Sequence, residues 1–199
     1  MTSPDEPSKP VPDLVRRLIG ERDLQERPVV PAEVLAIWQK GVRTAVDAML
    51  PALNPDTVVN LAYQAQMQAA LALLQARGLR THTQAGHHAK VIKVLRSYAK
   101  QEEHPRFVEA LDQFDALRQA RATSVYNADP ATEGDAEWAR TTMRAMLPEA
   151  LRALQTLLPS LGATLPVFAS TPAPRVKPEI PSSGTQHATP SQPVKGEGT

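Results

Sequence analysis

Residues 54–78, with the sequence NPDTVVNLAYQAQMQAALALLQARG, form the stretch that decides the fold of this chain. Asn54 is a favourable helix N-cap, Pro55 suits the first helical turn, and Gly78 is a typical residue just past a helix end. Alanines recur between these ends at steps of three and four, at Ala62, Ala65, Ala69, Ala72 and Ala76. Such a ridge of small side chains lets a neighbouring helix approach closely. We therefore expect this helix to be the most deeply buried element.

Apolar residues at helical spacing predict further helices on both sides of this central one. The predicted ranges are 32–50, 87–100, 105–125 and 132–158, preceded by a short helix around residues 14–19. Pro148 falls inside the last range and should kink or split that helix. No segment alternates between apolar and polar residues, so no strand is expected. The prediction is an all-α fold, an antiparallel bundle of four to five helices.

The prolines divide the chain into three parts. The 199 residues include 19 prolines, which cluster towards the two ends. Residues 1–30 are expected to form a partly disordered arm, residues 31–162 the helical bundle, and residues 163–199 a disordered tail rich in Pro, Ser and Thr.

Composition excludes several classes of function. The chain has no cysteine, which rules out disulfides, thiolate metal sites and a cysteine nucleophile. Its formal net charge is +1, so any footprint for a nucleic acid must be local. The first residues do not resemble a signal peptide, and no apolar run is long enough to span a bilayer, so we expect a cytoplasmic protein that does not bind membranes.

Basic residues gather on two of the predicted helices. Arg118 and Arg121 are three residues apart and continue the apolar face of their helix, which suggests a phosphate site or a charged partner surface, although arginine pairs at the end of a core helix are more often simply solvated. Lys90, Lys93 and Arg96 form a stripe that could follow a nucleic-acid backbone, although such a stripe is more often an ordinary solvated face.

Histidines offer little prospect of a metal site. His87 and His88 are adjacent, so on a helix their side chains diverge by about 100°. Together with His82 they match no ligand spacing, and we predict no metal and no cofactor. A cap or surface position is the simpler interpretation of the pair, and a position over the cleft formed near the arginines is the alternative.

Three segments of the chain resemble the HEPN family (higher eukaryotes and prokaryotes nucleotide-binding). Residues 60–63, 69–74 and 77–80 are similar to that family's second helix and the glycine that ends it. Residues 86–92 resemble the start of its third helix. Residues 118–127, RQARATSVYN, lie where the family carries its Arg-x4-6-His motif, here in a form that ends in tyrosine. The resemblance covers roughly residues 32–160.

The resemblance implies a homodimer that brings two motifs together, RNA as the target, and a metal-independent ribonuclease activity in the active members. Many members are toxins, or parts of defence systems, that have a nucleotidyltransferase as antitoxin partner. Carried over by position, Arg121 is the motif arginine and Tyr126 the terminal residue, and together they are the candidate catalytic pair. The chain departs from the family pattern at Ala122, at Val125 and in its lack of the motif histidine.

The missing histidine bears directly on the chemistry. Metal-free RNA cleavage needs a base for the 2′-hydroxyl proton and cations for the developing phosphorane charge. Arg118 and Arg121 can supply the charge, but a tyrosine with a pKa of about 10 is rarely deprotonated at pH 7. We therefore expect RNA binding through Arg118, Arg121, Lys90, Lys93, Arg96, His87 and His88 to be easier to detect than cleavage. A catalytically inactive interaction or dimerisation module is the alternative.

Overall fold

The structure is a computed structural model that describes residues 11–81, 86–127 and 129–169, with the backbone alone for residues 123–127. Our expectations of disorder for residues 1–10 and 170–199 fall outside this part of the chain.

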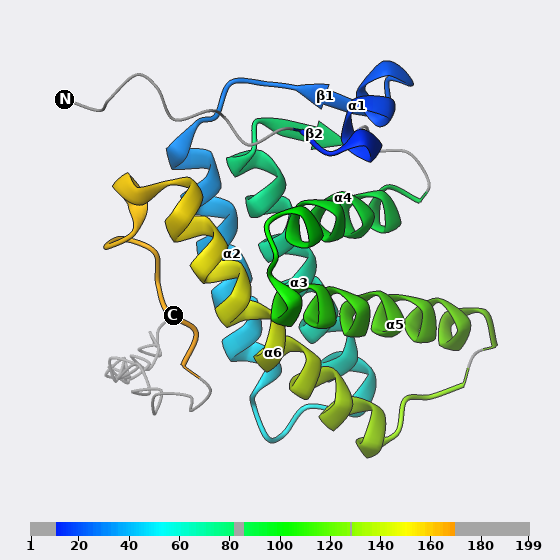
Figure 1. Ribbon diagram of the computed structural model, residues 1–199. Coiled ribbons are helices and arrows are strands. Elements are labelled where there is room, and N and C mark those ends of the chain that lie inside the picture. Colours follow the sequence, from blue (N-terminus) through cyan, green and yellow to red (C-terminus); the bar gives the residue numbers. More distant parts are fainter. Residues whose placement is uncertain (1–10, 82–85, 128, 170–199) are drawn as a thin grey trace, which may run out of the picture.

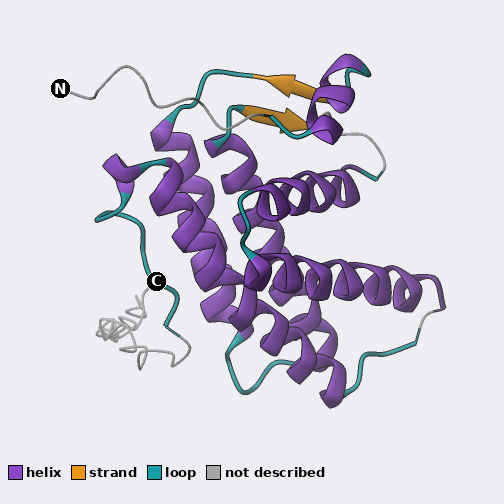
Figure 2. Cartoon of the chain, in the orientation of Figure 1, coloured by secondary structure: helices purple, strands orange, loops and turns teal. Residues whose placement is uncertain are grey.

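Helices make up most of the described chain (Figures 1 and 2). They are α1 (Asp13–Gly20), α2 (Pro31–Ala48), α3 (Pro55–Ala76), α4 (His87–Gln101), α5 (Pro105–Asn127) and α6 (Glu133–Leu157), followed by a short 3₁₀ turn, η1 (Pro159–Leu161). The prediction of an all-α helical bundle is confirmed. Helix α6 passes through Pro148 without a break, so the helix is not split there.

Helix α3 occupies the centre of the bundle and packs on both α2 and α6. Its alanine ridge is buried, as the sequence predicted. On the facing helix, a Cβ atom added to Gly41 would lie 3.3 Å from the carbonyl oxygen of Ala65. The missing side chain of Gly41 and the small ridge of α3 therefore allow the two helices to approach closely.

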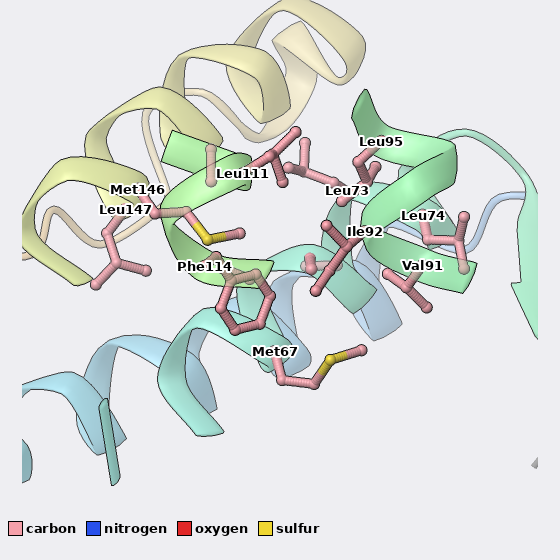
Figure 3. Packing of buried hydrophobic residues seen from close by; sticks show 14 of the residues in the cluster. Met67, Leu73, Leu74, Val91, Ile92, Leu95, Leu111, Phe114, Met146 and Leu147 are labelled. Carbon is pink, nitrogen blue, oxygen red and sulfur yellow. The ribbon is translucent and has the colours of Figure 1, made fainter. Parts of the chain in front are cut away.

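The other faces of α3 help to form a continuous apolar core with α4, α5 and α6 (Figure 3). Ile92 and Leu95 enter it from α4, Phe114 from α5, and Met146 from α6, and all four are at most 1% exposed. Burying side chains of this size contributes about 1.5–3 kcal/mol each. This packing fixes the positions of α3, α4 and α5, the three helices that carry the candidate site.

A two-stranded sheet corrects the expectation that the chain has no strand. Strands β1 (Leu24–Glu26) and β2 (Leu79–Thr81) pair antiparallel, with Leu24 opposite Thr81. Each strand is three residues long, which is too short for an alternating pattern to show in the sequence. Gly78 supplies the turn before β2 with a φ of +69°, and its carbonyl oxygen accepts a hydrogen bond from the backbone N–H of Arg27 at 2.8 Å.

The segment after η1 packs against the bundle, although we expected the tail to begin there. Leu165 is only 5% exposed, and the indole N–H of the buried Trp38 donates a hydrogen bond to the carbonyl oxygen of Pro166 at 2.9 Å. Proline-rich composition concealed this contact, which rests on the buried Leu165, the partly buried Phe168 and one backbone carbonyl.

Candidate functional site

Three helix segments meet at the candidate site. They are the first half of α3, the start of α4 and the second half of α5. Figure 1 shows the start of α4 and the end of α5 on the same side of the molecule. The side chains that meet there are those of Asn60 and Tyr63 from α3, His88 from α4, and Arg118 and Arg121 from α5.

Tyr63 and His88 form the centre of the site. The phenol oxygen of Tyr63 and Nδ1 of His88 are 2.6 Å apart, a short hydrogen bond whose donor depends on the imidazole tautomer. The ring of Tyr63 is 3% exposed and also packs on Phe114, with 5.5 Å between the ring centroids. Tyr63 is therefore held rigidly by the core, and it fixes the imidazole of His88, which is half-buried at the surface.

Arg121 also lies beside the ring of Tyr63. Its Nε donates a hydrogen bond to Oδ1 of Asn60 at 2.7 Å, and its guanidinium carbon lies 5.0 Å from the centre of the Tyr63 ring. Both partners are uncharged, so they orient the guanidinium without neutralising it. The bond to Asn60 uses Nε, and within the described residues no carboxylate pairs with Arg121, so its two terminal amino groups can bind a planar anion such as phosphate.

The second arginine of the pair has an acidic partner. Nε of Arg118 donates a hydrogen bond to Oδ1 of Asp115 at 2.7 Å. Arg96 on α4 lies beside the same group, with its Nε 2.7 Å from a carboxylate oxygen of Asp112 and a terminal nitrogen 3.9 Å from Asp115. These carboxylates offset part of the positive charge next to Arg121.

Burial and charge set the protonation of the central pair. The pKa of His88 is lowered, mainly by burial and further by electrostatic interaction with His87 and with the guanidinium groups of Arg121 and Arg118. The pKa of Tyr63 is raised by burial, and the two arginines only partly oppose this effect. At neutral pH the imidazole is therefore uncharged and the phenol keeps its proton.

The predicted site residues separate into two groups. Arg118, Arg121 and His88 come together, and His87 lies against His88 with 4.1 Å between the ring centroids. Arg96 joins them through Asp115.

The remaining predicted residues are not part of this cluster as described. Nζ of Lys90 lies 2.6 Å from a carboxylate oxygen of Asp23, in the turn that follows α1, and Lys93 is exposed to solvent. Tyr126 is in the last turn of α5, but its side chain lies outside the described part of the structure, as does His82. Within the described residues, no three His, Asp or Glu side chains are grouped closely enough to hold a metal ion.

Two site residues, Asn60 and Tyr63, were not predicted to have a role. They are three residues apart on α3, so they project from one face of that helix. The available signal was a phenol on the apolar side of α3 and an amide one turn before it, since a buried polar group requires a partner. The sequence could not reveal that the partners would be Arg121 and His88.

Comparisons of the chain with protein-family models, with curated proteins and with solved structures found no match. Among the helices that the structure describes, none combines the length and the apolar character needed to cross a bilayer.

Proposed function

We propose that the chain is a HEPN-like RNA-binding protein whose phosphate site is centred on Arg121. The observation that carries this proposal is the setting of that arginine between the uncharged partners Asn60 and Tyr63. An arginine that serves only to stabilise a fold is usually paired with a carboxylate. Here the guanidinium is held in place and keeps its charge, which is the arrangement that an anion site requires.

The class of anion follows from the surroundings and from the resemblance. Arg118 and the half-buried His88 border Arg121, so the site can contact a phosphate and the sugar next to it. Tyr63 is buried and offers no face on which a base could stack. We therefore propose recognition of the RNA backbone without strong sequence preference, consistent with the HEPN-like segments of the sequence.

Assembly belongs to the same proposal. A twofold dimer would bring two Arg121 sites together and raise the local positive charge, which an RNA strand would offset. A nucleotidyltransferase is the proposed antitoxin partner. Sedimentation at micromolar concentration should report a dimer, and a strict monomer with and without RNA would remove this part of the proposal.

A catalytically inactive interaction module remains the second candidate because of one observation. Arg118, Arg96 and Lys90 all face carboxylates of the same chain. If those pairs persist in solution, the surface presents little net positive charge to RNA, and the helices serve to bind another protein.

RNA affinity of matched arginine variants separates the two candidates. Binding of a fluorescent single-stranded 2′-O-methyl RNA, which cannot be cleaved through its 2′ oxygen, would be followed by anisotropy over a range of salt concentrations. Arg121→Ala should weaken binding roughly tenfold or more, since a hydrogen bond to a charged group contributes about 1.5–3 kcal/mol. It should also reduce the magnitude of the slope of log K against log salt by about 0.7 for each phosphate that the variant no longer neutralises.

The control is Arg152→Ala, which removes an exposed arginine of α6 that lies near the start of α5, away from the site. This variant should bind as the wild type does. If the wild type does not bind RNA at low salt, or if Arg121→Ala binds unchanged, the RNA-binding proposal fails and the interaction module is favoured.

A further inference from the structure

The imidazole of His88 supplies a titratable group that the arginine-to-tyrosine motif lacks. In the sequence His88 is 33 residues before Arg121, far outside the spacing of that motif. In the structure both residues contact the ring of Tyr63, with the His88 and Tyr63 centroids 5.7 Å apart and the Arg121 guanidinium carbon 5.0 Å from the Tyr63 centroid. A histidine and an arginine beside one phenol are the two kinds of group that metal-free cleavage of RNA needs.

We infer that His88 is the general base of a metal-independent RNA cleavage at this site, and that Tyr63 is the residue that positions it. This inference rests on the RNA-binding function proposed above. It assigns the proton transfer to α4 and leaves Arg121, with Arg118, to stabilise charge on the phosphate.

The reaction is a transesterification within the RNA strand. Nε2 of His88 removes the proton of a ribose 2′-hydroxyl, and the 2′ oxygen forms a bond to the adjacent phosphorus. The bond from phosphorus to the 5′ oxygen of the next nucleotide breaks, and that oxygen takes a proton from water. The products are a 2′,3′-cyclic phosphate and a 5′-hydroxyl, and the imidazolium returns its proton to solvent.

Tyr63 explains how the imidazole can act in this way. When Nδ1–H of His88 donates to the phenol oxygen at 2.6 Å, the lone pair of the neutral ring lies on Nε2. The phenol cannot move, because its ring is packed on Phe114 in the core. This contact fixes the ring orientation, and the tautomer in which Nδ1–H donates to the phenol is the one that leaves Nε2 free to accept the proton.

The charged groups around His88 keep it in the form that a base requires. Arg118 and Arg121 face it from α5, His87 is its neighbour on α4, and Asp115 is the acidic group beside the cluster. Burial and the positive neighbours lower the pKa of His88, so the imidazole is unprotonated at neutral pH. The same arginines disfavour the imidazolium that forms during the reaction. The negative charge that develops on the phosphate near the arginines and the imidazolium offsets this repulsion.

Cleavage of a single-stranded RNA in EDTA tests the inference, with analysis of product ends and parallel binding of the 2′-O-methyl RNA. We expect the wild type to produce 2′,3′-cyclic phosphate ends. His88→Ala should lose at least about 100-fold in rate, the lower limit for general base catalysis, and added imidazole should restore part of it. The variant should still bind the 2′-O-methyl RNA, with a smaller loss of affinity than Arg121→Ala, because the arginine carries the charge that holds the phosphate. His104→Ala, a histidine beyond the far end of α4, is the matched control and should cleave normally.

The pH profile and Tyr63→Phe complete the test. The wild-type rate should rise with pH to a plateau whose midpoint lies below about 6.5, the ordinary pKa of histidine. Tyr63→Phe should lower kcat with little change in KM, whereas a loss of folding would lower the thermal midpoint as well.

Two results would overturn the inference while leaving RNA binding intact. One is a wild type that binds the 2′-O-methyl RNA but does not cleave RNA. The other is cleavage that does not depend on His88, shown by an unchanged rate in His88→Ala. If that rate also keeps rising between pH 7 and 9 and is lost in Tyr126→Phe, the tyrosine is the base. Absence of binding by the wild type would instead refute the function on which the inference rests.

Discussion

Leu165→Ala should destabilise the fold, because this side chain anchors the segment that follows η1 to the bundle. Leu165 is 5% exposed, and replacing a buried leucine by alanine typically costs about 2–5 kcal/mol. In the variant the segment can detach from the bundle, so that no cavity remains. The loss in free energy of unfolding is therefore limited to the free energy with which the segment docks. We therefore expect about 2–3 kcal/mol, which lowers Tm by about 4–12 °C for a domain of this size.

Val167→Ala is the matched control on the same segment. Val167 is 71% exposed, so its replacement should change the free energy of unfolding by less than about 0.5 kcal/mol. Both variants would be measured by thermal and urea unfolding.

Tryptophan fluorescence reports the same contact directly. The chain has two tryptophans, and Trp138→Phe leaves Trp38 as the single reporter. Trp38 is buried and donates its indole N–H to Pro166, so Leu165→Ala in this background should shift its emission to the red below the melting transition. Equal melting temperatures for Leu165→Ala and Val167→Ala, with unchanged emission, would refute the docking of this segment.

Two further predictions concern helix α6 and the site histidine. Thr132→Ala should lower the free energy of unfolding by about 1 kcal/mol, because it disrupts the capping box at the start of α6. In this box Oγ1 of Thr132 accepts a hydrogen bond from the backbone N–H of Asp135, and the Asp135 carboxylate accepts one from the backbone N–H of Thr132. The control is Thr156→Ala, which replaces an exposed threonine of the same helix and should not lower Tm. The pKa of His88 is lower in the folded state, so as the pH falls the unfolded chain takes up the proton before the folded chain does. The free energy of unfolding should therefore decrease as the pH drops below about 6.5 towards the folded-state pKa. Urea unfolding of His88→Gln should show a weaker pH dependence in that range.

The helical part of the fold was accessible from the sequence because burial repeats with the helical period. The alanine ridge of α3 and the apolar face of α6 showed directly which sides of the helices lie inside. The strands were not accessible, since three residues carry no period. Docking of Leu165 was hidden for a related reason, because it depends on one side chain in a proline-rich segment and on a carbonyl oxygen that meets Trp38.

The site was only partly accessible because its pairs join distant positions. Helical spacing brought Arg118 and Arg121 to one face, but the partner of Arg121 is Asn60, which is 61 residues away in the sequence. Whether His88 turns towards solvent or towards α3 depends on how α4 rotates as its apolar residues pack. A sequence pattern fixes which face of a helix is apolar, but it does not fix which polar residue at the edge of that face meets which neighbour.

Pairing of the arginines with carboxylates determines how much each can contribute to an anion site. A phosphate that approaches Arg118 also approaches Asp115, so part of the attraction is cancelled by repulsion from the carboxylate. Arg121 has no such opposition from Asn60 or from the ring of Tyr63. Among the described residues of this site, Arg121 is the arginine without a carboxylate partner, and it lies close to a neutral imidazole. One fixed cation gives weak binding of the ground state. The same cation beside a base is well suited to a phosphate that gains negative charge during the reaction. This geometry therefore favours stabilisation of a transition state over tight binding of the ground state.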